Sequence, residues 1–116
     1  MTSIVIVEDN AGVAEMLSAF SSLRYDDLEV VAVFASVAAA QAWDGWDDVD
    51  GALVDWMMPL ANGGAMLDWL AVHAPHVACH IMTAATPMPT HPHAVAVWPK
   101  ARFEFALEAL RGPGQR

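Results

Sequence analysis

The chain has 116 residues, of which 56% are hydrophobic and 16% charged, and its formal net charge at pH 7 is −9. This length suits one domain with a core of its own, and the hydrophobic content excludes a disordered chain. Only five residues are Lys or Arg. The charge therefore argues against direct binding to nucleic acid, which needs many cationic side chains to displace counterions.

The sequence also lacks the signals of export or membrane insertion. Cys79 is the single cysteine, so no intrachain disulfide can form and a reducing compartment is expected. The first ten residues lack the basic region of a signal peptide. The longest nearly apolar stretch, residues 30–42, is too short to cross a bilayer. We expect a cytoplasmic protein that does not bind membranes.

The first half of the chain alternates predicted strands and helices. Residues 4–7 form a β-branched run typical of a strand buried on both faces. Asn10 can cap a helix over residues 11–23, whose sheet-facing side chains recur every three or four residues: Val13, Leu17, Phe20 and Leu23. A second strand is predicted over residues 30–34, and Ser36 can cap a helix that continues to about residue 42.

The middle of the chain continues the alternation. Residues 43–51 (WDGWDDVDG) read as a polar turn, followed by a strand over residues 52–54 that ends on Asp55. After the loop PLANGG, a helix is predicted over residues 65–74, with Met66, Leu67 and Leu70 facing inward. A fourth strand is predicted over residues 77–82.

The pattern changes after Thr83. Residues 84–94 (AATPMPTHPHA) contain three prolines, which a helix cannot accommodate at this spacing. A fifth strand over residues 94–98 and a last helix over residues 102–110 complete the chain, and residues 113–116 are expected to form a tail. Alternating strands and helices predict a three-layer α/β domain with an open parallel sheet.

Residues able to carry chemistry gather at the predicted strand ends. They are Glu8, Asp9, Asp55, Thr83 and Lys100. Open parallel sheets bind ligands beyond the carboxyl ends of their strands, so these side chains should share one edge. A carboxylate can act as a nucleophile toward phosphorus. Clustered carboxylates facing an anionic phosphoryl group need a cation, and Mg²⁺ suits such hard oxygen ligands.

These residues resemble the receiver domain of two-component response regulators, of the stand-alone type. Pro59 and Gly63, four and eight residues after Asp55, fit the family pattern as well. The resemblance covers essentially the whole chain and implies a flavodoxin-like sheet with five strands in the order 2-1-3-4-5. It also implies that a sensor histidine kinase or a histidine phosphotransfer protein phosphorylates Asp55.

The resemblance assigns a role to each site residue. Asp9 would bind Mg²⁺ directly and Glu8 through water, with further oxygens from Asp55 and the main-chain carbonyl of Met57. Lys100 would pair with the phosphoryl oxygens. The Thr83 hydroxyl would donate to another of them. Signalling would then proceed by contact with an unknown downstream protein.

The sequence departs from the family pattern after the fourth strand. The proline-rich segment stands where typical receivers have a fourth helix, and Val97 stands where they have a switch aromatic. Trp98 next to it is therefore a switch candidate beside Thr83. Pro99 precedes Lys100 instead of following it, which leaves the Trp98–Pro99 bond as the local candidate for a cis peptide.

Two other functions remain open at this stage. A degenerate receiver could act as a phosphorylation-independent protein-binding module through residues 84–98. A small phosphohydrolase could use Asp55 as its nucleophile, although such enzymes normally carry a second acid two positions later, where this chain has Met57. The sequence does not choose between an effector, a relay intermediate and a phosphate sink.

Overall fold

The computed structural model describes residues 1–112. Five parallel strands form one sheet in the order β2-β1-β3-β4-β5. The strands are β1 (Thr2–Val7), β2 (Leu28–Phe34), β3 (Gly51–Asp55), β4 (Ala78–Thr83) and β5 (Ala94–Pro99). The helices are α1 (Ala11–Arg24), α2 (Val37–Ala42), α3 (Gly63–His73) and α4 (Phe103–Arg111), with short 3-10 turns η1 (Trp46–Asp48) and η2 (Lys100–Arg102). The predicted flavodoxin-like fold is confirmed; the expected tail lies outside the described residues.

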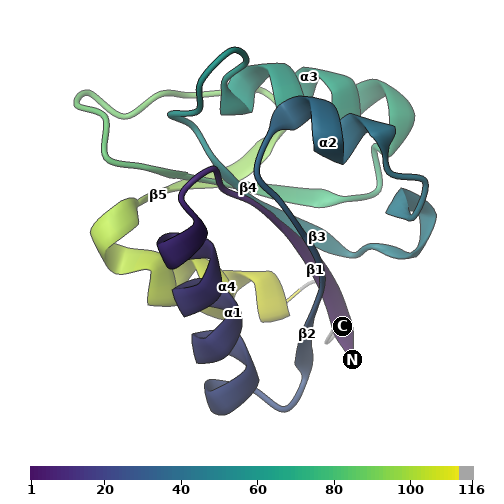
Figure 1. The fold of residues 1–116 in the computed structure, drawn as a ribbon, viewed down its shortest axis with the longest axis vertical. Helices are drawn as coiled ribbons and strands as arrows, with labels where there is room; N and C mark the ends of the chain where they lie inside the picture. The colour runs from purple at the N-terminus through teal and green to yellow at the C-terminus, as the bar shows by residue number, and fades with distance from the viewer. Residues whose placement is uncertain (113–116) are drawn as a thin grey trace.

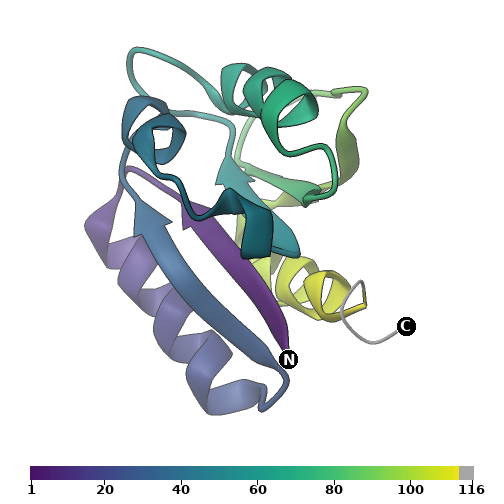
Figure 2. The same cartoon turned by 90° about the vertical axis from the view of Figure 1, so that its right-hand side faces the viewer.

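Helices cover both faces of the sheet. In Figure 1, α2 and α3 lie on one face and α1 and α4 on the other, and Figure 2 shows the layers from the side. The alternating side chains of β1 feed two separate cores: Val5 and Val7 pack toward α2 and α3, while Ile4 and Ile6 pack toward α1 and α4. β1 and β3 are buried on both faces along most of their length, which explains their unbroken apolar runs, Ile4 to Val7 in β1 and Ala52 to Val54 in β3.

Side-chain caps fix where the helices begin. The Oδ1 atom of Asn10 accepts the Val13 N–H at 3.0 Å, and the Oγ atom of Ser36 accepts the Ala39 N–H at 3.1 Å, as expected for these two caps. Asn62 caps α3 in the same way, so this helix begins at Gly63, earlier than predicted. The first cap places α1 immediately after the acidic pair at the end of β1.

One predicted inward residue of α1 is wrong. Leu23 is 90% exposed, whereas Ala14, Leu17 and Ser21 form the buried stripe. A helix turns once every 3.6 residues, so a stripe that passes through position 17 returns at 20 or 21 and again at 24. Leu23 therefore falls beside the stripe and projects into solvent.

The predicted polar turn after α2 is in part a core element. Trp46 in η1 is only 4% exposed, and its indole N–H donates to the Ala40 carbonyl at 2.9 Å. Its ring meets that of Trp43 edge to face at 5.5 Å. Gly45 is required between them because a Cβ there would lie 2.2 Å from the Trp43 ring. Asp44, Asp47 and Asp48 are exposed, whereas Asp50 is half-buried and its Oδ2 atom accepts the Ser3 N–H at 2.8 Å.

No helix connects β4 to β5, as the prolines predicted, in the part of the chain that the structure describes. The His91 Nδ1 atom accepts the His93 N–H at 3.0 Å, so the ring's proton sits on Nε2, which donates to Asp68 of α3 at 2.7 Å. This contact ties the connecting segment, residues 84–93, to α3. The cis peptide is Thr86–Pro87, so the expectation placed on the Trp98–Pro99 bond is wrong.

The helices are all short compared with the thickness of a lipid bilayer. Within residues 1–112, none is long and apolar enough to span a membrane.

Candidate functional site

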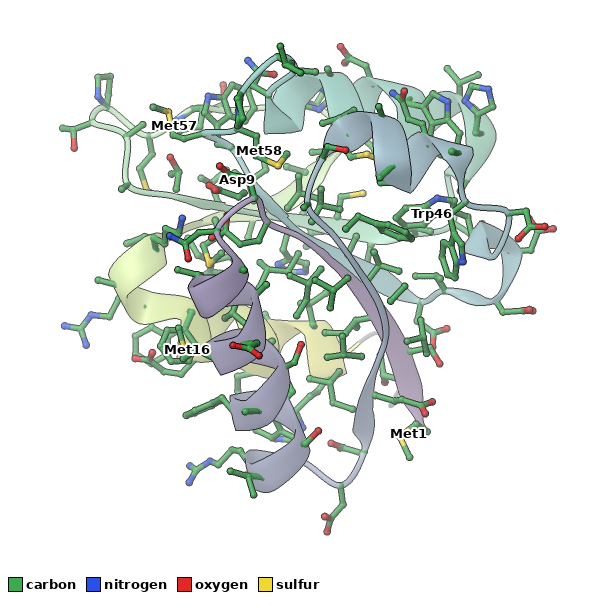
Figure 3. The ribbon with its side chains drawn as sticks, in the orientation of Figure 1. Met1, Asp9, Met16, Trp46, Met57 and Met58 are labelled. Carbon is green, nitrogen blue, oxygen red and sulfur yellow. The ribbon has the colours of Figure 1, made fainter. Side chains whose placement is uncertain are left out.

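Three carboxylates meet where β1 and β3 end. Val7 pairs with Val54 in the sheet register, so Glu8 and Asp9 leave β1 beside the end of β3, where Asp55 lies. One oxygen from each carboxylate lies within 4.8 Å of the others. Glu8 and Asp55 are each 1% exposed, whereas Asp9 is exposed. Figure 3 shows Asp9 at the tip of β1, at the same end of the sheet as Met57 and Met58.

Lys100 contacts two of these carboxylates from the end of the edge strand β5. It opens η2 directly after β5, and its Nζ atom lies 2.7 Å from Oε1 of Glu8 and 3.2 Å from Oδ2 of Asp55. The other oxygen of Asp55, Oδ1, accepts the Met57 N–H at 3.2 Å. The ammonium therefore bridges the acidic cluster and neutralises part of its charge.

The buried position of Glu8 shows in its titration. Burial and, second to it, contact with Asp55 raise the pKa of Glu8 to about 7, although Lys100 acts to lower it. Burial also acts to lower the pKa of Lys100, but its contacts with Glu8 and Asp55 hold that pKa above the ordinary value. The Lys100 ammonium contacts only Oε1 of Glu8, and the buried Oε2 has no hydrogen-bond partner. The negative charge of the Glu8 carboxylate is therefore only partly neutralised within the protein.

The donor set suits a hard divalent cation. Three carboxylates face a single ammonium, so the cluster carries excess negative charge, and Oε2 of Glu8 lacks a hydrogen-bond donor. Mg²⁺ prefers oxygen ligands and retains waters, which matches one exposed and two buried carboxylates. In the described residues, this is the one group of three or more acidic, His or Cys side chains that could hold a metal.

Thr83 and Trp98 lie on different faces of the sheet. Thr83 ends β4 and is 1% exposed, and its Oγ1 atom accepts the Ala85 N–H at 2.9 Å, which leaves the hydroxyl proton free to donate. Ile81 packs toward α2 and α3, so alternation along β4 directs Thr83 to that side. Trp98 packs with the α1 and α4 core, and its indole N–H donates to His80 Nδ1 at 3.0 Å.

Residues 4–97 match the response regulator receiver domain family. The chain belongs to this family. The matched region contains the three carboxylates, the loop after β3 and Thr83, while Lys100 lies just beyond it. No curated protein matches the chain.

Solved structures of receivers share the fold. A LuxR-family DNA-binding response regulator from Staphylococcus aureus is 18% identical with a TM-score of 0.81, and the alignment covers 99% of this chain and 100% of that one. The response regulator domain of Thermotoga maritima CheB is 17% identical with a TM-score of 0.81, covering 97% and 96%. Thermotoga maritima TrrA, solved with Mg²⁺ and beryllofluoride, is 16% identical with a TM-score of 0.76, covering 95% and 99%.

Gly63 explains how this receiver holds its central aspartate. A Cβ at Gly63 would lie 2.8 Å from the Asp55 carbonyl oxygen and 3.0 Å from the Cα of Trp56. The Gly63 N–H instead donates to the Trp56 carbonyl at 3.1 Å and closes the loop between β3 and α3. The pattern with Pro59 identified this glycine, but its role as a close contact of the Asp55 backbone needed the structure.

The sequence did not indicate two contacts at or near this site. The ion pair of Lys100 with Glu8 depends on the lysine's reach past the ends of β4 and β3, which strand order alone does not specify. The bond of Trp98 to His80 depends on which face of β5 the indole occupies. The contact between Trp98 and His80 could have been suspected from the sequence. Side chains alternate between the two faces along β4 and β5, and a buried polar His needs a hydrogen-bond partner.

Proposed function

We propose that the chain is a cytoplasmic single-domain response regulator whose Asp55 accepts a phosphoryl group from a phosphohistidine. The donor is a sensor histidine kinase or a histidine phosphotransfer protein, and the signal passes on through contact with another protein. The observation that supports this best is a nearly buried aspartate at the end of β3, beside two further carboxylates and in contact with the Lys100 ammonium. The receiver family supplies the reaction class.

The reaction transfers phosphorus from nitrogen to oxygen. A carboxylate oxygen of Asp55 forms the new P–O bond, the P–N bond of the donor imidazole breaks, and that imidazole takes up a proton. Bound Mg²⁺ would neutralise charge on the phosphoryl oxygens, held by Asp55, Asp9 and the Met57 carbonyl, with Glu8 acting through water. Lys100 would exchange its contacts with the carboxylates for the phosphoryl group.

Thr83 would connect phosphorylation to the rest of the molecule. Its free hydroxyl proton can donate to a phosphoryl oxygen, and its Oγ1 atom already holds the Ala85 N–H. A movement of Thr83 toward Asp55 would therefore pull the start of residues 84–93 while His91 holds their other end on α3. In this proposal Trp98 is the second switch candidate, because it lies two residues before Lys100 and would report movement of the end of β5.

The direct test is intact-mass spectrometry after incubation with acetyl phosphate. We expect one phosphoryl adduct on the wild-type chain with Mg²⁺, none with a chelator, and none on Asp55→Asn. Asp48→Asn changes an exposed carboxylate in η1 and should leave the adduct in place. Absence of an adduct from acetyl phosphate and from phosphorylated histidine kinases would instead favour the protein-binding module.

A further inference from the structure

A hollow of about 460 Å³ lies between α4 and the two strands at one edge of the sheet, β4 and β5. Its volume is within the range of sites that bind small molecules. Ala78 of β4, Ala96 of β5 and Ala109 of α4 form part of its walls. Three elements thus contribute side chains no larger than a methyl group, and the space that larger aliphatic residues would fill stays open.

This hollow is separate from the acidic cluster. Asp50 and His76, which also line it, lie just before β3 and β4 begin, whereas Asp55 and Thr83 are the last residues of those strands. The hollow is therefore near the opposite ends of these strands, and a molecule bound in it would not occupy the place of a phosphoryl group on Asp55.

The wall of the hollow includes a buried donor without a partner. His80 is 2% exposed and lines the hollow beside Trp98, whose indole N–H donates to His80 Nδ1 at 3.0 Å. Burial lowers the pKa of His80 to about 4, so the ring is neutral at pH 7 and its one proton is on Nε2. Among the described residues, this buried Nε2 atom has no hydrogen-bond partner. A buried donor left unpaired is costly, so the N–H is suited to contact a ligand.

The polar groups of the hollow favour an uncharged ligand. The carboxylate of Asp50 disfavours anions, and the N–H of His80 disfavours cations and cannot ligate a metal. The Oδ2 atom of Asp50 accepts the Ser3 N–H at 2.8 Å, and its carboxylate has further lone pairs that can accept from a ligand. The indole of Trp98 adds an aromatic wall, which suits a flat ring.

We infer that this hollow binds a small, uncharged, planar ring with a carbonyl group next to an N–H, as in a cyclic amide. The carbonyl oxygen accepts the N–H of His80, the ring N–H donates to the carboxylate of Asp50, and the ring packs against Trp98. This site goes beyond the proposed function, because it takes a free small molecule and no phosphoryl group.

The test is a titration of the whole chain with 2-quinolinone, a bicyclic amide, followed by ¹H–¹⁵N NMR at pH 7. We expect saturable binding, with the largest shifts at the indole N–H of Trp98 and the ring nitrogens of His80. The N-methyl derivative cannot donate to Asp50 and should bind about fivefold to tenfold more weakly, as expected for one lost hydrogen bond. Quinoline-2-carboxylate should not bind, because its charge faces Asp50.

Matched leucine substitutions locate the probe. Ala109→Leu fills the hollow from α4 and should abolish saturable binding; the residue is half-buried, and leucine is a good helix former, so the fold should persist. Ala71→Leu adds the same side chain to the exposed surface of α3 and should bind the probe like the wild type.

Two further variants test the contacts and the independence of the site. His80→Phe removes the N–H and should weaken binding of 2-quinolinone about fivefold to tenfold. Because it also leaves the indole of Trp98 without its acceptor, a thermal melt is recorded alongside, and Ala109→Leu keeps the test valid if this variant unfolds. Asp55→Asn cannot be phosphorylated at position 55 and should bind the probe like the wild type.

The outcomes decide the inference without reference to phosphorylation. The absence of a saturable shift at Trp98 and His80, up to the solubility limit of 2-quinolinone, would overturn it. Equal affinity of Ala109→Leu and the wild type would place the probe elsewhere on the chain and overturn it too, as would equal affinity of a folded His80→Phe. The acetyl phosphate experiment tests the proposed function separately, and neither result predicts the other.

Discussion

Glu8 is the residue at which burial and charge conflict most directly. Its pKa is raised from 4.5 to about 7, first by burial and then by Asp55. Between these two values the folded chain holds a proton that the unfolded chain has released. The contribution of Glu8 to the free energy of unfolding therefore falls as pH rises from 4.5 to 7.

Replacing this carboxylate should stabilise the metal-free protein. At pH 8 in a chelator, we expect Glu8→Gln to raise the free energy of unfolding by about 1 to 2 kcal/mol, because a buried charge is removed while Lys100 keeps Asp55. Near pH 4.5 the variant and wild type should converge. Urea denaturation at both pH values measures the difference. A variant less stable at pH 8 would mean that the ion pair with Lys100 outweighs the burial of Glu8.

His80 should produce the opposite pH dependence. Burial lowers its pKa from 6.5 to about 4, and its Nδ1 atom accepts the Trp98 indole N–H. The unfolded chain takes up a proton below 6.5 and the folded chain does not, so stability from this group is lost as pH falls from 6.5 toward 4.

A substitution at position 80 should isolate this effect. His80→Asn keeps an acceptor near the position of Nδ1 but cannot titrate. We expect the stability of His80→Asn relative to wild type to improve as pH falls from 7 to 5, whatever their order at pH 7. The check is urea denaturation of both proteins across that range. A constant difference would show that His80 has the same pKa in the folded and the unfolded chain.

At the scale of elements, the start of α3 determines the position of the central aspartate. The backbone at Gly63 passes so close to Asp55 and Trp56 that a methyl group has no room. The same helix carries Asp68, which holds the segment from β4 to β5. The helix α3 therefore contacts both the backbone at Asp55, through Gly63, and residues 84–93, through Asp68.

Two glycines in helices allow a matched comparison. Gly63→Ala should lower the free energy of unfolding by about 1 to 3 kcal/mol and slow phosphorylation by acetyl phosphate, because the backbone at Asp55 must shift. Gly12 is an exposed residue of α1, where an added Cβ would meet only Asn10 Oδ1 at 3.3 Å. Gly12→Ala should therefore raise the free energy of unfolding by up to about 1 kcal/mol. Thermal melts and intact-mass time courses measure both effects. Equal melting temperatures for the two variants would contradict the crowding at Gly63.

The elements that could be predicted from sequence are those with a local signal. A β-branched run identified β1, a short apolar run ending on Asp55 identified β3, the caps Asn10 and Ser36 located two helices, and the prolines excluded a helix before β5. The errors arose where tertiary contacts decide. Leu23 belongs to an apolar pattern but misses the sheet by its angle on the helix, and Trp46 is buried within an acidic stretch by contacts with residues earlier in the chain.

At the scale of the molecule, the site is assembled from three strand ends and held together by Lys100. The ammonium contacts Glu8 and Asp55, both of which lie far before it in the sequence, at the ends of β1 and β3. The parallel topology made the meeting of these residues predictable. The ion pairs that form without metal were not predictable, because the carboxylates that Lys100 contacts depend on side-chain reach and burial.

Metal should stabilise the whole domain. Three carboxylates within 4.8 Å of one another repel when ionised, so we expect millimolar Mg²⁺ to raise the melting temperature by a few degrees. Asp9→Asn should start from a higher melting temperature in a chelator and respond less to Mg²⁺. Differential scanning fluorimetry measures both. A wild-type melting curve indifferent to Mg²⁺ would contradict the metal site.

The most direct measurement is to locate the phosphoryl group itself. After phosphorylation with Mg²⁺ and acetyl phosphate, borohydride reduces an aspartyl phosphate to homoserine, which peptide mass spectrometry assigns to one position. We predict homoserine at position 55 alone, and none in a chelator. Homoserine at position 9, or at no position while a kinase donor is consumed, would contradict the assignment of Asp55 as the phosphoacceptor.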